Sequence, residues 1–90
     1  MMNVVWKYIL AKGELQYISM PTGSKVLSVQ TQDGVPCLWA LGDPSKSHKP
    51  RMIRILGTGF QSADVHAHQY VGTFQQGLFV WHVFDLGDVA

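Results

Sequence analysis

Two arginines and a glycine-flanked threonine form the segment of this chain that is best suited to hold an anion. Arg51 and Arg54 precede Gly57-Thr58-Gly59, and all of them lie within RMIRILGTGF, residues 51–60. Guanidinium groups bind phosphate or carboxylate through charge-assisted hydrogen bonds, and backbone N–H groups can add to such a site. Phosphate-binding motifs need further glycines at fixed offsets and a following helix, so the tripeptide is also consistent with a turn that ends a strand. Arg54 likewise has two interpretations, an anion anchor or a long side chain lying along an outer face.

Aromatic and amide side chains suggest a second kind of chemistry, the recognition of a planar ligand. Trp39 or Phe60 could stack on a nucleobase while Gln30 hydrogen-bonds to the edge of the base. Arg54 would then meet the phosphate. The alternative is that the amides and aromatic rings lie in an interface between subunits. The candidate ligand-binding or partner-binding residues are Gln30, Trp39, Arg51, Arg54, Thr58, Phe60 and His82.

The residue inventory predicts neither catalysis nor a metal site. Cys37 lies in an apolar strand, where a thiolate is disfavoured. The six acidic residues fall mostly in turns or near the C-terminal end, so no pair of carboxylates is evident for acid–base work. In a strand, His66 and His68 would point to one side and could form a metal site with His48 or His82. Structural zinc sites usually contain thiolates, however, and Cys37 is the only cysteine. We therefore expect a protein that is not an enzyme and needs no cofactor.

Strands must position these side chains, and the clearest strand signal is a hairpin within residues 25–44. Asp33-Gly34 separates two alternating runs and suits the positive φ angles of a type I′ turn. A two-residue turn sets the register, with Leu27 opposite Ala40. One predicted face is plain core and contains Leu27, Val29, Leu38 and Ala40. The other face is predicted to meet a partner because it mixes amides, a thiol and an indole; it contains Ser28, Gln30, Gln32, Cys37, Trp39 and Leu41.

The remaining sequence predicts further short strands and one long loop. The segments are a first hairpin from Val4–Leu10 and Leu15–Met20, a loop at Gly42–Arg51 and a strand at Met52–Leu56. Gln61–His68 tolerates a helical turn, with Ser62 as its cap.

A last hairpin joins residues 69–75 to residues 78–86 through Gln76-Gly77. This register places Phe74 opposite Phe79 and the indole of Trp81 over the bare backbone of Gly72. Both faces are substantially apolar, as in a sandwich or at a subunit interface. The predicted fold is all-β: a small, mainly antiparallel meander of about seven strands that forms a sandwich or partly open barrel, with little or no helix.

Composition predicts one small domain that covers part of its surface with a partner. Residues 1–90 form a single β domain in which 47% of residues are apolar and 14% are charged, against roughly 25% charged residues in typical domains. A homo-oligomer would cover the apolar surface. The net charge of +1 gives no general attraction to duplex nucleic acid or to an anionic membrane. With one cysteine and no apolar run of transmembrane length, we expect a cytoplasmic protein.

Several motifs together resemble a family of small uncharacterised proteins of bacteriophages and prophages. MPTGSKVLSVQ, CLWAL, GTG, GTFQ and WHVF follow one another between Trp6 and Phe84, although Gly42 stands where the family has a valine or similar residue. The resemblance implies no catalytic residue. It implies a binding protein in the host-cell cytoplasm, an anti-defence factor that inhibits a host protein or sequesters an anionic nucleotide-like signal. The alternative is a virion-associated or scaffolding protein whose sheet faces serve oligomeric assembly.

Overall fold

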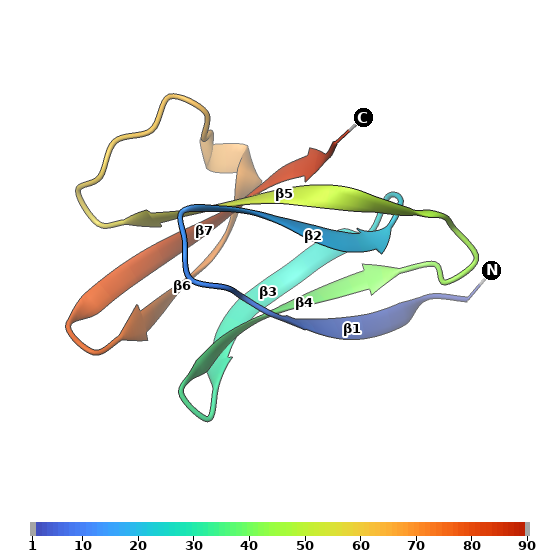
Figure 1. The fold of residues 1–90 in the computed structure, drawn as a ribbon, viewed down its shortest axis with the longest axis horizontal. Coiled ribbons are helices and arrows are strands. Elements are labelled where there is room, and N and C mark those ends of the chain that lie inside the picture. Colours follow the sequence, from blue (N-terminus) through green and yellow to red (C-terminus); the bar gives the residue numbers. More distant parts are fainter. Residues whose placement is uncertain (1, 90) are drawn as a thin grey trace.

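The computed structural model describes residues 2–89, which form two antiparallel β-sheets packed face to face (Figure 1). The three-stranded sheet has the order β1-β4-β3, and the four-stranded sheet has the order β2-β5-β7-β6. The elements are β1 (Val4–Ile9), β2 (Leu15–Pro21), β3 (Lys25–Gln32), β4 (Val35–Gly42), β5 (His48–Gly57), the 3₁₀ turn η1 (Ala67–Gln69), β6 (Tyr70–Gln76) and β7 (Phe79–Asp88). The prediction of an all-β fold of about seven mainly antiparallel strands is confirmed, and of its two alternatives, a sandwich or a partly open barrel, the structure has the sandwich.

The core lies between the sheets because successive side chains of a strand point to opposite faces. Each sheet buries one set of alternating residues, and the two sets form a single cluster. Its most buried members are Met20, Leu38, Ala40, Ile53 and Val83. The other face of each sheet is directed outward, so the molecule has two broad outer faces on opposite sides.

The hairpin of β3 and β4 has the predicted turn. Asp33 and Gly34 have φ angles of 52° and 79°, and the predicted pairing holds from the turn to Ser28 and Trp39. A β-bulge between Val26 and Ser28 then adds a residue, so Val26 instead of Leu27 lies opposite Ala40. The placement of Leu27 in the core is wrong: the bulge turns it outward, where its side chain is 44% exposed.

The predicted first hairpin does not form, because β1 and β2 belong to different sheets. β1 pairs with β4, and β2 pairs with β5. The connection between them, residues 10–14, crosses from one sheet to the other and is held at both ends. The Leu10 N–H donates to the Pro36 carbonyl at 3.0 Å, and the Ile55 N–H donates to the Glu14 carbonyl at 2.7 Å. Each strand thereby extends a larger sheet instead of forming an isolated two-stranded ribbon.

The last hairpin forms between β6 and β7, but its register differs from the prediction. Phe74 lies opposite Trp81, and Gly72 lies opposite Val83. The loop residues are Gly77-Leu78, and Gly77 has a φ of 59°. A glycine with positive φ at the first loop position suits a type II′ turn, which explains why the loop lies one residue later than predicted.

The two irregular segments are shorter than expected. The predicted loop at 42–51 is reduced to residues 43–47, because β4 includes Gly42 and β5 begins at His48. Of the segment 61–68 that was predicted to tolerate a helical turn, only residues 67 and 68 belong to the single turn η1, which is capped at His66 and not at Ser62. Within residues 2–89, no helix has the length and apolar character needed to cross a membrane.

Candidate binding site

The seven predicted site residues lie in four places. Arg54, Thr58 and His82 come together on the outer face of the four-stranded sheet, as the register of β5 and β7 requires. Gln30 and Trp39 lie on the outer face of the other sheet, on the opposite side of the molecule. The predicted set therefore does not converge on one site. The remaining two residues are Arg51, which is buried, and Phe60, which is exposed at the end of the sandwich.

Arg51 is a buried structural residue whose guanidinium nitrogens are all engaged. Its Nε donates to Asp88 at 2.7 Å, its Nη1 to Asp85 at 3.0 Å and its Nη2 to the Ser24 carbonyl at 2.5 Å. Burial on its own would raise the pKa of Asp88, but hydrogen bonds from the Gly23 N–H and from Arg51 outweigh it and lower that pKa. Arg51 therefore ties β7 to the turn between β2 and β3 and has no guanidinium nitrogen free for a ligand.

Arg54, Thr58 and His82 belong to two separate sets of hydrogen bonds on this face, and most of their polar atoms already have partners. Arg54 Nη2 bonds to Asp64 Oδ2 at 2.5 Å, and this bond is the main cause of the lowered pKa of Asp64. The Arg54 Nε is buried without a hydrogen-bond partner. Both ring nitrogens of His82 are engaged, Nε2 with Thr58 Oγ1 at 2.7 Å and Nδ1 with Thr73 Oγ1 at 3.0 Å. The loop of residues 58–69 is thus fastened over this face, leaving few of these polar atoms for an external ligand.

The Trp39 face has the mixed character that the sequence predicts, with one difference. Gln30 is exposed and Trp39 is half-buried, but Cys37 is 2% exposed. Lys7 reaches over this face from β1, and its Nζ donates to Gln32 Oε1 at 2.8 Å, across the central strand β4. The buried thiol is therefore not available to a partner.

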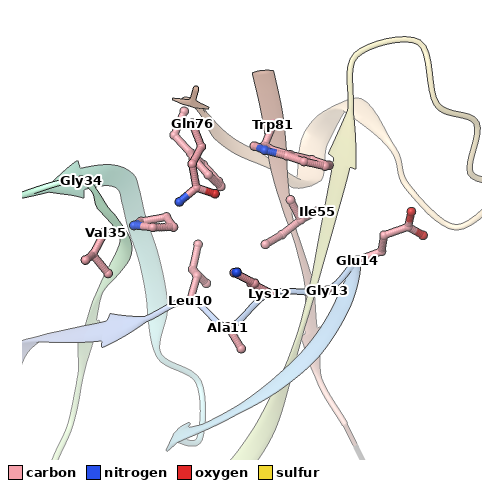
Figure 2. A pocket seen from close by; sticks show the side chains of 12 residues that line it. Leu10, Ala11, Lys12, Gly13, Glu14, Gly34, Val35, Ile55, Gln76 and Trp81 are labelled. Atoms are coloured by element: carbon pink, nitrogen blue, oxygen red, sulfur yellow. The ribbon is translucent and has the colours of Figure 1, made fainter. Parts of the chain in front are cut away.

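A cavity that the sequence analysis missed opens at one end of the sandwich. It has a volume of about 460 Å³ and lies between the crossing segment 10–14, the β3–β4 turn and the hairpin of β6 and β7. Figure 2 shows Gln76 and Trp81 on one side of it and Leu10 and Ala11 on the other. The lining is mainly apolar, with further contributions from Val35, Pro36, Ile55 and Phe74. We call this cavity the end pocket.

Exposed apolar side chains continue the lining of the end pocket beyond the two sheets. Phe79 stacks on Trp81, with ring centroids 5.9 Å apart, and is 66% exposed. Leu78, at the tip of the same hairpin, is 99% exposed. A Cβ at Gly57 would lie 3.3 Å from the Trp81 ring and 3.5 Å from the Phe60 ring, so Phe60 lies near Trp81, which lines the pocket. The result is an apolar surface at one end of the molecule, of the size and character that small ligands and side chains occupy.

Charged groups at the end pocket are few and of opposite sign. Lys12 and Glu14, both in the crossing segment, are the charged residues that line it.

Two signals in the sequence point toward this pocket: the amide Gln76, and the alternation of Phe79 and Trp81 past an apolar turn. Neither signal was sufficient to predict the pocket, because one wall of the pocket is the crossing segment 10–14, and the sequence predicted a hairpin turn there.

Metal binding finds no geometric support in the part of the chain that the structure describes. Among residues 2–89, no three side chains of His, Cys, Asp or Glu come together as a ligand set. His66 and His68 stack on each other with their ring centroids 5.8 Å apart.

Comparison with known proteins gives a family match that covers almost the whole chain. The model of the family described as "Domain of unknown function (DUF7352)" matches residues 1–89. No match was found among curated proteins or among solved structures.

Proposed function

This chain belongs to the DUF7352 family, whose function is unknown, and we propose that it is a non-enzymatic binding protein that holds an apolar segment of a protein partner in the end pocket. One observation carries the proposal: a cavity of about 460 Å³ with a mainly apolar lining. Phe79 stacks on Trp81 of this lining and is exposed, and Leu78 at the tip of the same hairpin is exposed as well. Apolar pockets with exposed apolar residues nearby commonly mark binding sites.

A protein segment suits this pocket better than an anionic nucleotide does. A phosphate requires uncompensated positive charge or convergent N–H donors, and the pocket offers Lys12 together with Glu14. On the Arg54 face, a phosphate would have to displace Asp64, which already holds the guanidinium. Apolar side chains, by contrast, gain free energy from burial against Leu10, Ile55 and Trp81 without leaving a charge unpaired.

We further propose that the partner is a host protein and that the chain acts as a phage-encoded anti-defence factor in the host cytoplasm. This step rests on the resemblance to bacteriophage and prophage proteins. The absence of a catalytic role is also part of the proposal. It is supported by the burial of Cys37 and by the engagement of both His82 nitrogens with threonine hydroxyls.

A second candidate function is a virion-associated or scaffolding protein, and the exposed apolar residues of β1 support it. Val5 and Ile9 are 54% and 66% exposed, as expected of a strand that takes part in assembly. Mass spectrometry of purified phage particles separates the two functions. Stoichiometric presence in the particle supports assembly, and presence only in infected cells supports the host-directed role.

Site-specific photo-crosslinking tests the end pocket as the binding site. A benzophenone amino acid at Gln76, which lines the pocket, is compared with the same amino acid at Gln75, the next residue, whose side chain lies on the other face of β6. We expect crosslinks from position 76 to one host peptide rich in large apolar residues, and far fewer from position 75. Leu78→Lys should suppress the crosslink. Equal labelling from both positions, or crosslinks insensitive to Leu78→Lys, would contradict the proposal.

A further inference from the structure

Strand β1 is an edge strand with an unused hydrogen-bonding side. Within residues 2–89 its only ladder partner is β4, and Figure 1 shows it at the margin of its sheet. The Leu10 N–H donates to Pro36, and this pair continues the register of β1 with β4. Because bonded pairs alternate in an antiparallel ladder, the even-numbered residues of β1 bond to β4. The N–H and C=O groups of Val5, Lys7 and Ile9 therefore point away from the sheet.

The other edges of the two sheets are protected or less apolar. β3 and β6 lie side by side, so close that a Cβ at Gly72 would come within 2.8 Å of Val29 Cγ1. β2 carries polar residues on both faces, Gln16 and Ser19, and ends in Pro21. β1 has the sequence VVWKYI, with one charged residue. Natural proteins usually blunt an exposed edge with charge or proline, because a bare apolar edge pairs with another strand.

We propose that β1 pairs antiparallel with β1 of a second copy, across a twofold axis that passes beside Lys7. This register places Val5 opposite Ile9 of the partner subunit on the outer face. On the inner face it places Trp6 opposite Tyr8 of the partner subunit, a cross-strand aromatic pair of the kind that stabilises sheets. Two three-stranded sheets then become one six-stranded sheet, and the outward N–H and C=O groups of β1 find partners.

β1 is self-complementary, and for this reason we infer that the strand pairing with its free edge is β1 of a second copy. A twofold interface needs a surface that fits itself, and a short antiparallel strand with apolar residues on both sides of its centre meets this condition. The only like-charge contact is Lys7 against Lys7 of the partner subunit. Each Lys7 ammonium is directed away from the edge, because its Nζ donates to Gln32 Oε1, across β4, at a distance of 2.8 Å. The dimer does not depend on the function proposed for the end pocket.

Sedimentation equilibrium with one pair of matched variants tests the dimer. Ile9→Lys changes an exposed apolar residue of β1 to lysine, and Leu78→Lys makes the same change at the tip of the β6–β7 hairpin. We expect wild type and Leu78→Lys to be dimeric, and Ile9→Lys to dissociate with a Kd raised roughly tenfold or more, the effect of about 1.4 kcal/mol. Circular dichroism checks that both variants are folded. Leu78→Lys is also the variant that should suppress crosslinking at the end pocket. Because it should remain dimeric, failure of the pocket proposal and failure of the dimer proposal give different results.

Amide hydrogen exchange in the wild type gives a second test with a residue-level signature. In the dimer, the N–H groups of Val5, Lys7 and Ile9 should exchange as slowly as those of Trp6 and Tyr8. On dilution to the monomer, the odd-numbered set alone should lose its protection. A wild-type protein that stays monomeric at about 100 µM, or a dimer in which the odd-numbered amides of β1 exchange freely, would overturn the proposal.

Discussion

Arg51 and Arg54 lie in one strand, and their separation decides that they have different roles. Residues three apart in a strand point to opposite faces, so Arg51 enters the space between the sheets while Arg54 lies on the outside. The first is 4% exposed and bound to two carboxylates and a carbonyl. The sequence predicted the strand only from Met52 and left Arg51 in the preceding loop, so the entry of Arg51 into the core was not predicted. The acceptors of Arg51 were not predicted either, because Asp85 and Asp88 are brought to it by the pairing of β5 with β7.

Arg51→Ala should lower the free energy of unfolding by about 3 kcal/mol, the lower end of the range for breaking a buried ion pair, because both carboxylates keep some solvent contact. Arg54→Ala is the control, and its loss should be much smaller, because Asp64 is exposed to solvent, which screens the ion pair. Urea denaturation measures both. Equal losses for the two variants would show that the burial of Arg51 does not matter.

Asp88 should make stability depend on pH in the acid range. Burial opposes its ionisation, but the Gly23 N–H and Arg51 lower its pKa in the folded protein below that of the unfolded chain, which is about 3.9. Its stabilising contribution is therefore complete above the unfolded pKa and is lost as the pH falls through the folded pKa. Thermal unfolding as a function of pH should show a smaller acid loss of Tm in Asp88→Asn than in wild type. Parallel curves for the two proteins would contradict this.

At the scale of elements, the two sheets meet most closely where β3 and β6 run side by side. The contact depends on Gly72, since Val29 Cγ1 occupies the space that a side chain would need. Val29 belongs to the core and is β-branched, so it cannot rotate away cheaply. This junction protects two sheet edges that would otherwise be exposed to other chains.

Gly72→Ala should destabilise the protein by about 1–3 kcal/mol, the usual cost of overpacking. Gly57→Ala is the matched control and should destabilise the protein less, because its new Cβ would lie 3.3 Å from the Trp81 ring and 3.5 Å from the Phe60 ring, both looser contacts than 2.8 Å. Combining Gly72→Ala with Val29→Ala should cost less than the sum of the single changes, which a double-mutant cycle measures. Strict additivity would mean that the two residues do not compete for space.

Local sequence signals predicted the elements well and their partners only in part. Asp33-Gly34 specified a turn and its register because both residues accept positive φ. The same reasoning failed for residues 10–14, since a five-residue segment with a glycine suits a hairpin loop and a crossing between sheets equally well. The bulge at Leu27 could not be predicted from the alternation of residues, because Val26 and Leu27 are both apolar and either could face the core.

At the scale of the whole molecule, the binding residues were the hardest to predict. Trp39 and Arg54 were grouped by chemistry, but the sandwich places them on opposite sides. The end pocket draws its lining from segments as distant as Leu10 and Trp81. Its location becomes evident only when the crossing segment, the β3–β4 turn and the last hairpin are assembled. Predicting it required the topology, which is the part of the fold that the sequence left open.

The crossing segment also governs the order in which the chain can fold during synthesis. β1 has no ladder partner until β4 has been made, and β2 waits for β5. The ribosome therefore releases two strands before their ladder partners exist, whereas β3 and β4 can pair as soon as both have been made. Such distant pairings make folding slow, because the loops must close before the contacts are gained. The hairpin at Asp33-Gly34 is then the natural nucleus, and the N-terminal strands join it late.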